Sequence, residues 1–114
     1  MTIIMAKQRT YSQYAREAAA LMGEQVRLGR KQCRWSEKNL AERAGISRAT
    51  LQKIENGDMS CAVGLVFEVA TLVGVKLFEP GSIPLSKHIE HTRDKIALLP
   101  TRIRTTEKAI NDDF

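Results

Sequence analysis

A glycine, Gly45, divides one segment of the chain into two short amphipathic stretches. Before it, Leu40, Ala41 and Ala44 recur at helical spacing and form a small apolar face. Gly45 can adopt the left-handed backbone conformation that ends a helix, and Ser47 can cap a second helix directly after it. Alanines on the inner face let two helices approach closely. The segment therefore predicts two short helices held at a steep angle by a tight turn.

The stretch after this turn has one apolar side and one polar side. Leu51 and Ile54 fall on the same side at helical spacing, so the residues between them point the other way. Two amphipathic helices of a small bundle would also have a solvated basic face. Here, however, a turn glycine, closely spaced alanines and an N-cap directly before Arg48 coincide. We therefore interpret the pair as a DNA-binding unit whose second helix lies in a major groove.

The same segment, with Arg30 upstream and the sequence Glu55-Asn56-Gly57 at its end, resembles the Xre/Cro-like helix-turn-helix family of phage and bacterial repressors. The resemblance extends from about residue 22 to residue 75. It implies an all-α, five-helix, lambda-repressor-like domain. In this chain the domain is expected to have an extended N-terminal helix and an additional C-terminal helix followed by a tail.

Four residues are expected to contact bases, because DNA sequence is read through base edges in the major groove. Arg48 and Lys53 suit the acceptors of guanine, Gln52 can pair with adenine, and Ala49 offers a methyl group to thymine. The resemblance places Arg48, Ala49 and Lys53 at positions that carry base contacts in phage repressors.

Phosphate contacts are expected at the starts of both helices and at the end of the second. The resemblance assigns Ser47 and Asn56 to the DNA backbone. Family members often have glutamine where this chain has Glu37, and a carboxylate cannot donate a hydrogen bond to a phosphate. The clamp at the first helix is therefore expected from its unpaired amides and from three side chains, Ser36, Lys38 and Arg43.

Arg30 and Glu55 match a pair that forms a salt bridge in the family. The pair would tie the N-terminal helix to the end of the recognition helix. Its role would be structural, since loss of one partner of a buried ion pair costs several kcal/mol even where the intact pair adds little net stability.

The positive charge is concentrated in the half of the chain that carries this motif. Residues 7–57 contain eleven Lys or Arg against five Asp or Glu, whereas residues 58–100 contain four against five and residues 101–114 three against three. Attraction to a phosphate backbone requires such a local field. With 5% aromatic residues, the core must be aliphatic and alanine-rich.

Helical patterns and Pro/Gly positions suggest four regions along the chain. These are an N-terminal arm, the DNA-binding domain, a C-terminal helix for dimer or partner contact, and a flexible tail, at residues 1–11, 12–79, 80–100 and 101–114. Helices are expected over residues 12–32, 37–44, 48–56, 61–73 and 84–99, with Ser36, Ser60 and Ser82 as caps. Residues 75–78 are predicted as a connector that forms a strand or a final helical turn.

Apolar residues within these helices predict the core. Trp35, after the first helix, is expected to cover one end of it. The first helix should face the core with one stripe of residues, Tyr14, Ala18, Leu21, Met22, Gln25, Val26 and Gly29. The fourth helix should do so with Val63, Val66, Phe67, Ala70 and Val73.

Dimerisation is expected because one recognition helix reads only about four base pairs, too few to define a site in a genome. A two-fold dimer on a near-palindrome would solve this. The apolar residues left after the core is built form the expected dimer surface, and these are Val75, Leu77, Phe78, Ile83, Leu85 and Ile89.

Other kinds of site have little support. His88 and His91 could bind a metal, but with no third ligand at a firm spacing a solvated polar face is the simpler interpretation. Cys33 and Cys61 are too few for a disulfide framework, and we expect both to be reduced. No catalytic triad, phosphate loop, signal peptide or apolar span is apparent. We therefore expect a cytoplasmic, non-enzymatic protein with no metal, cofactor or membrane contact.

Three functions remain open. The long C-terminal addition, which ends in NDDF, looks like regulators of the HipB type, and this resemblance implies an antitoxin that autoregulates its operon and binds a HipA-like kinase toxin, with Phe114 inserted into the partner. A stand-alone Xre-type repressor with an inert tail is the alternative. A helix-turn-helix used only as a protein scaffold is the third, and would bind independently of salt.

Overall fold

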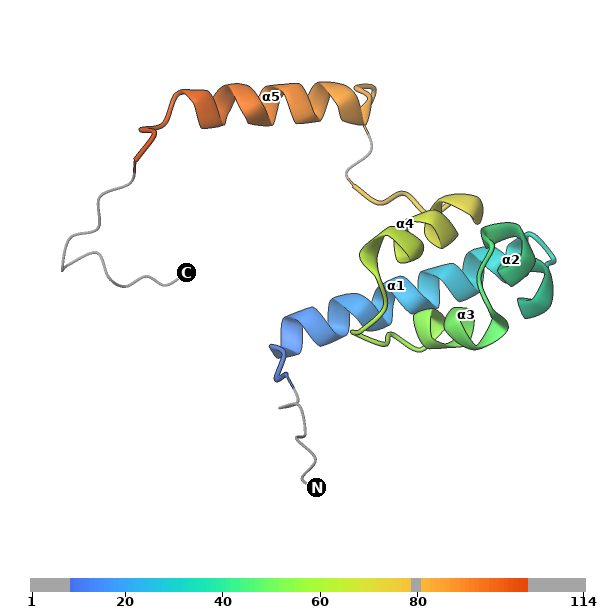
Figure 1. The fold of residues 1–114 in the computed structure, drawn as a ribbon. Helices are drawn as coiled ribbons and strands as arrows, with labels where there is room; N and C mark the ends of the chain where they lie inside the picture. Colours follow the sequence, from blue (N-terminus) through green and yellow to red (C-terminus); the bar gives the residue numbers. More distant parts are fainter. Residues whose placement is uncertain (1–8, 79–80, 103–114) are drawn as a thin grey trace. The chain divides into compact units, whose positions relative to one another are not determined.

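The computed structural model describes residues 9–78 and 81–102. These residues form five helices and no strands, so the predicted all-α class is confirmed (Figure 1). Within the described ranges, none of the helices is long and apolar enough to cross a membrane. The helices are α1 Gln13–Gln32, α2 Glu37–Ala44, α3 Arg48–Glu55, α4 Val63–Leu72 and α5 Leu85–Ala97.

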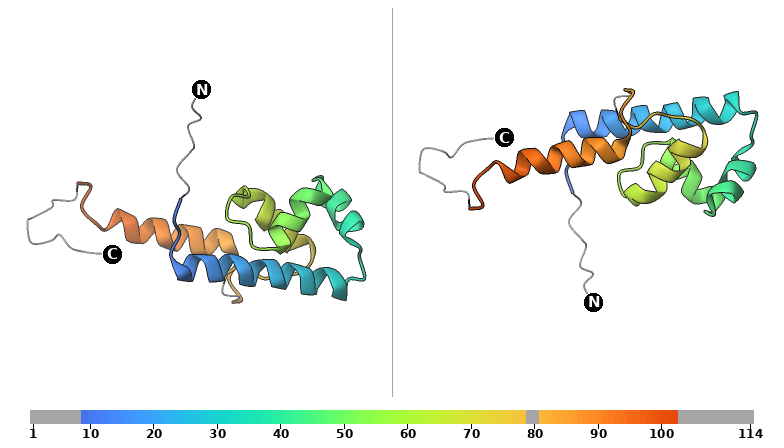
Figure 2. Two further views of the ribbon diagram at one scale, coloured as in Figure 1. Left: turned by 90° about the horizontal axis from the view of Figure 1, so that it is seen from below. Right: turned by 90° about the horizontal axis from the view of Figure 1, so that it is seen from above.

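The chain divides into two compact units, one ending at Glu79 and the other beginning at Pro80. The first unit contains α1 to α4, and the second contains α5. In the first unit α1 is a long rod, and the other three helices gather along its C-terminal half (Figure 2). Each of α3 and α4 contacts both α1 and α2.

The core of the first unit is small and aliphatic, as the low aromatic content predicts. Every helix of the unit contributes to it, and its buried side chains interlock across short distances because several are small. The buried apolar residues are Val26, Leu40, Ala41, Leu51, Ile54, Val69, Ala70 and Val73. Trp35 packs partly buried against this cluster, in agreement with its predicted place at one end.

The turn between α2 and α3 has the predicted chemistry. Gly45 has φ 71°, the left-handed conformation that ends α2 without a Cβ clash. The Ser47 hydroxyl accepts a hydrogen bond from the Thr50 amide at 3.0 Å, which caps α3. The Ser36 hydroxyl caps α2 in the same way, by accepting from the Asn39 amide at 3.0 Å.

A close backbone approach places α3 against α1. A Cβ built on Gly23 of α1 would lie 2.5 Å from the carbonyl oxygen of Glu55, at the end of α3. Only glycine allows this distance, because a real Cβ would collide with the backbone. Helix α3 is thus fixed against α1 at its C-terminal end.

The predicted stripe of α1 is wrong in its N-terminal half. Tyr14 is 82% exposed and Leu21 58% exposed, and Ala18 and Gln25 are exposed as well. The buried residues of α1 are instead Gly23, Val26, Gly29 and Arg30. The reason is that α3 and α4 cover only the C-terminal half of this helix, so helical spacing alone could not show where the stripe ends (Figure 2).

The fourth helix begins later than predicted, and a different side of it faces the core. It starts after Ala62 and not at Cys61, and Ser60 does not cap it, because the amide and hydroxyl of Ser60 both donate to the Asp58 carboxylate at 2.7 Å and 2.5 Å. Val63 is 64% exposed, and Val69 is buried in its place. The helix is apolar on nearly all sides, so the sequence pattern could not define its inner face.

The connector after α4 has no regular structure over residues 75–77. Val75 and Leu77, predicted to be left over for a dimer surface, pack partly against the core. Phe78 is 60% exposed, and its ring lies edge-on to that of Phe67 at 6.3 Å between centroids. The expected dimer surface therefore loses two residues in this unit to the core.

The second unit contains α5, which is shorter than predicted at both ends. It runs from Leu85 to Ala97, and Ser82 does not cap it, because Pro84 occupies the N-cap position without a side-chain hydrogen bond. None of the helix residues is buried. Leu85, Ile89 and Ile96 are at least half exposed, at 51%, 50% and 61%.

Candidate nucleic-acid interface

Helix α3 presents its polar side to solvent. Leu51 and Ile54 are buried under it, at 0% and 3% exposure. All four residues predicted to contact bases are exposed, and these are Arg48, Ala49, Gln52 and Lys53. Asn56, at the C-cap of α3, is exposed as well. The sequence-predicted base readers thus share one outer surface, which we call the α3 face.

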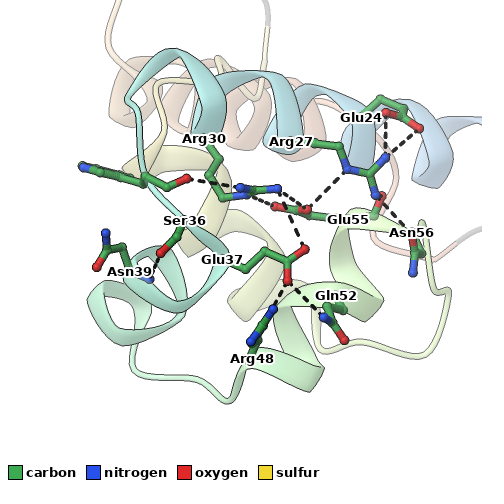
Figure 3. Close-up of polar contacts among 11 residues, drawn as sticks. Glu24, Arg27, Arg30, Ser36, Glu37, Asn39, Arg48, Gln52, Glu55 and Asn56 are labelled. Carbon is green, nitrogen blue, oxygen red and sulfur yellow. Dashed lines mark hydrogen bonds and ion pairs between the residues drawn. The ribbon is translucent and has the colours of Figure 1, made fainter.

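Arg30 of α1 binds Glu55, the last residue of α3. Its Nε donates to Oε2 of Glu55 at 2.7 Å and its Nη2 donates to Oε1 of Glu55 at 3.1 Å, a two-pronged ion pair (Figure 3). Its Nη1 donates to the carbonyl oxygen of Trp35 at 3.2 Å. Glu55 is 2% exposed and Arg30 8%, so both charges are buried. The hydrogen bond to Glu55 raises the pKa of Arg30 and keeps it cationic.

Arg27 is a second clamp that sequence reasoning missed. Its Nη2 donates to Oδ1 of Asn56 at 3.1 Å, and its Nε lies 3.4 Å from Oε1 of Glu55. A further ion pair joins it to Glu24 at 3.2 Å. Arg27 stands three residues before Arg30, hence on the same face of α1. That spacing was the signal that could have revealed it.

Glu37 links α2 to two of the residues predicted to contact bases. Its Oε1 accepts hydrogen bonds from Nε of Arg48 at 3.1 Å and from Nε2 of Gln52 at 3.0 Å (Figure 3). Its Oε2 lies 4.0 Å from Nη2 of Arg30. The bonds from Gln52 and Arg48 lower the pKa of Glu37, so the carboxylate is ionised at neutral pH. The sequence alone indicates only that Glu37 cannot donate a hydrogen bond to a phosphate, and does not predict these contacts.

The residues predicted to contact phosphate differ in the contacts that their side chains make within the protein. Lys38 is exposed. The Ser36 hydroxyl accepts the capping bond from the Asn39 amide, whereas the Ser47 hydroxyl both accepts from the Thr50 amide and donates to Oγ1 of Thr50 at 2.9 Å. The guanidinium of Arg43 stacks over the Trp35 ring, 4.1 Å from its centroid.

The other candidate groups of the sequence lie apart from the α3 face. Cys33 and Cys61 are free thiols of intermediate exposure, and partial burial raises the pKa of Cys61. His88 and His91 are exposed on α5. Among the described side chains, no group of three or more His, Cys, Asp or Glu is placed to hold a metal ion. Phe114 lies outside the described residues.

Comparison with known proteins identifies the motif. Residues 26–79 match the helix-turn-helix family, so this part of the chain is a DNA-binding regulator domain. This match agrees with the resemblance to the Xre-like class that the motif around Gly45 indicates. The match begins inside α1, and both the N-terminal half of α1 and all of α5 lie outside it.

Three solved structures are similar to part of this chain. Two are described as complexes of HipB with 20-mers named O2 and O4, the first of them with a HipB variant; they are 20% and 21% identical to this chain with TM-scores of 0.49 and 0.48. A third, described as MDT protein, is 21% identical with a TM-score of 0.49. Each alignment covers 68% of this chain and 100% of the other. No curated protein matches the chain.

Proposed function

We propose that the protein is a transcriptional repressor that binds a palindromic operator in double-stranded DNA as a homodimer. The observation that carries this proposal is the α3 face. Arg48, Gln52 and Lys53 are exposed there together, on a helix whose opposite side is buried and whose end is fixed by the Arg30–Glu55 ion pair. A helix anchored in this way can enter a major groove without losing its orientation.

In this proposal the α3 face reads bases through Arg48, Ala49, Gln52 and Lys53. The starts of α2 and α3 and the C-cap of α3 would contact the DNA backbone through Ser36, Lys38, Arg43, Ser47 and Asn56. Arg43 would have to leave the Trp35 ring or bind phosphate from its stacked position. Measuring affinity for duplex DNA between low and physiological salt tests the proposal, because several phosphate contacts predict a steep loss. Binding that does not change with salt would contradict it.

The dimer contact is proposed to use the exposed apolar residues that follow the core. In the first unit this residue is Phe78, which is 60% exposed. In the second unit the residues are Ile83, Leu85 and Ile89, which are 41–51% exposed. Sedimentation equilibrium of Leu85→Asp tests this assignment. We expect a monomer where the unchanged protein is a dimer, whereas an unchanged dimer would exclude α5 from the contact.

The antitoxin role belongs to the same proposal. The segment from Pro80 onward lies outside the match to the helix-turn-helix family, and α5 exposes apolar residues there that the first unit does not need for its core. We propose that this segment, with Phe114, binds a HipA-like kinase toxin in the cytoplasm. Deleting residues 101–114 should abolish binding of a co-expressed kinase from the same operon and leave operator binding intact. Normal operator control in an operon without a kinase would favour the stand-alone repressor instead.

A further inference from the structure

Glu37 is an anion on a surface that is otherwise suited to polyanions. It is the first residue of α2, beside the helix amides that are expected to receive a phosphate. A carboxylate at this place repels the DNA backbone and reduces the positive field that drives non-specific binding. Attraction to DNA therefore does not explain a glutamate at this position, whereas its contacts provide an explanation.

We propose that Glu37 is a specificity-determining residue that orients Arg48 and Gln52 for base contact and lowers affinity for all other DNA. This inference rests on the proposed reading of bases by the α3 face. Both side chains donate to the same oxygen of Glu37, Oε1, at 3.1 Å and 3.0 Å (Figure 3). One acceptor thus sets the positions of two base readers from neighbouring turns of α3.

The carboxylate itself is anchored to the core. Its other oxygen, Oε2, lies 4.0 Å from Nη2 of Arg30, and Arg30 is held by two bonds to the buried Glu55. The chain of charges runs from the core through Arg30 to Glu37 and on to Arg48. Glu37 therefore positions its partners against a fixed reference, and not as a freely moving surface side chain.

For Arg48 the contact selects one edge of the guanidinium. Nε is occupied by Glu37, which leaves the two Nη groups, and a planar guanidinium can present these as a two-pronged donor to O6 and N7 of guanine. The Arg48 side chain is 64% exposed and makes its ion pair with Glu37. Without Glu37 it would be free to turn toward a phosphate, a contact that carries no sequence information.

For Gln52 the contact settles which way the amide faces. A carboxylate only accepts hydrogen bonds, so Nε2 must point toward Glu37 and the amide oxygen away from it. The second Nε2 hydrogen and the amide oxygen remain for N7 and the N6 amino group of adenine. A glutamine at position 37 would leave this orientation open, because an amide can both donate and accept.

The test separates discrimination from affinity. The unchanged protein first selects its preferred site from a random duplex library, and dissociation constants are then measured for that duplex and a scrambled duplex of equal length. For Glu37→Gln we expect weaker binding to the selected site and tighter binding to the scrambled one. Their ratio should fall about tenfold, the size of one good bidentate base contact.

Glu42→Gln is the matched control. Glu42 is an exposed acid on the same helix, so its replacement removes the same charge from α2. It should tighten binding to both duplexes alike and leave the ratio unchanged. Combining Glu37→Gln with Arg48→Ala gives a second readout, since the effect of Glu37 on guanine preference should disappear when Arg48 is absent.

An equal change on both duplexes for Glu37→Gln, with a melting temperature like that of the unchanged protein, would overturn this inference alone. An effect on guanine preference that persists in the Arg48→Ala background would overturn it too. An unchanged protein that selects no sequence at all would overturn the proposed function, and this inference with it.

Discussion

The helices α3 and α5 have similar sequence patterns but different surroundings. Both are amphipathic and carry Lys or Arg. The shorter, α3, buries Leu51, Ile54 and Glu55 and is capped by Ser47, whereas α5, five residues longer, buries none of its residues and has no side-chain cap. The apolar side of α3 is satisfied by its own chain. Within its own unit, α5 buries none of its apolar residues, so the two helices should respond differently to the same kind of substitution.

The largest expected difference concerns two arginines. Arg30→Ala removes the partner of the buried Glu55 carboxylate and should lower the free energy of unfolding of the first unit by about 3–5 kcal/mol. Arg93→Ala, at an exposed position of α5, should change it by less than about 0.5 kcal/mol. Urea unfolding followed by fluorescence of Trp35, the single tryptophan, reports on the first unit alone. Equal effects of the two substitutions would show that the ion pair does not hold α3.

The next difference concerns aliphatic side chains. Leu51→Ala leaves a cavity under α3 and should cost about 3 kcal/mol by the same Trp35 signal. Ile89→Ala, at a residue that is 50% exposed on α5, should leave this unfolding curve in place. If Ile89→Ala destabilised the first unit as strongly, α5 would have to pack on its own chain.

A smaller difference is expected at the helix starts. Ser47→Ala removes the bond to the Thr50 amide and should lower the stability of the first unit by about 1 kcal/mol. Ser82→Ala removes a hydroxyl that caps nothing in the described structure of α5 and should have no measurable effect. Helix content from circular dichroism provides the check, and a loss for Ser82→Ala would show that this residue caps α5 after all.

The smallest effect is a titration. The pKa of Glu37 is held below its ordinary value by Gln52 and Arg48, so these contacts stabilise the folded state above the ordinary carboxyl pKa and are lost as pH falls through the lowered one. NMR titration should show the low pKa in the unchanged protein and a rise toward the ordinary value in Gln52→Ala. An unaltered pKa in that variant would mean that the hydrogen bond does not form in solution.

The helix-turn-helix could be predicted closely because local chemistry decides it. Gly45, Ser36 and Ser47 fix where α2 and α3 begin and end, and short-range capping bonds do not depend on the rest of the fold. The exposed side of α3 followed in turn from the spacing of Leu51 and Ile54. Residue types and positions then pointed to Arg48 and Gln52.

The features that could not be predicted from the sequence depend on contacts between segments that are distant in the chain. The sequence could not show that only half of α1 is covered, or that Val69 and not Val63 of α4 faces the core. It also could not show that Glu37 meets Arg48 and Gln52, since that contact depends on the angle between α2 and α3. Resemblance to the family showed only that Glu37 stands where many members have glutamine. The structure shows which side chains Glu37 contacts.

Arg48→Ala is the sharpest test of whether the outer face of α3 reads DNA sequence. Duplex selection should be repeated with this variant and compared with the unchanged protein. We predict that binding persists through the remaining phosphate contacts while preference for guanine is lost at one position in each half-site. Identical preferred sequences for the two proteins would contradict the account.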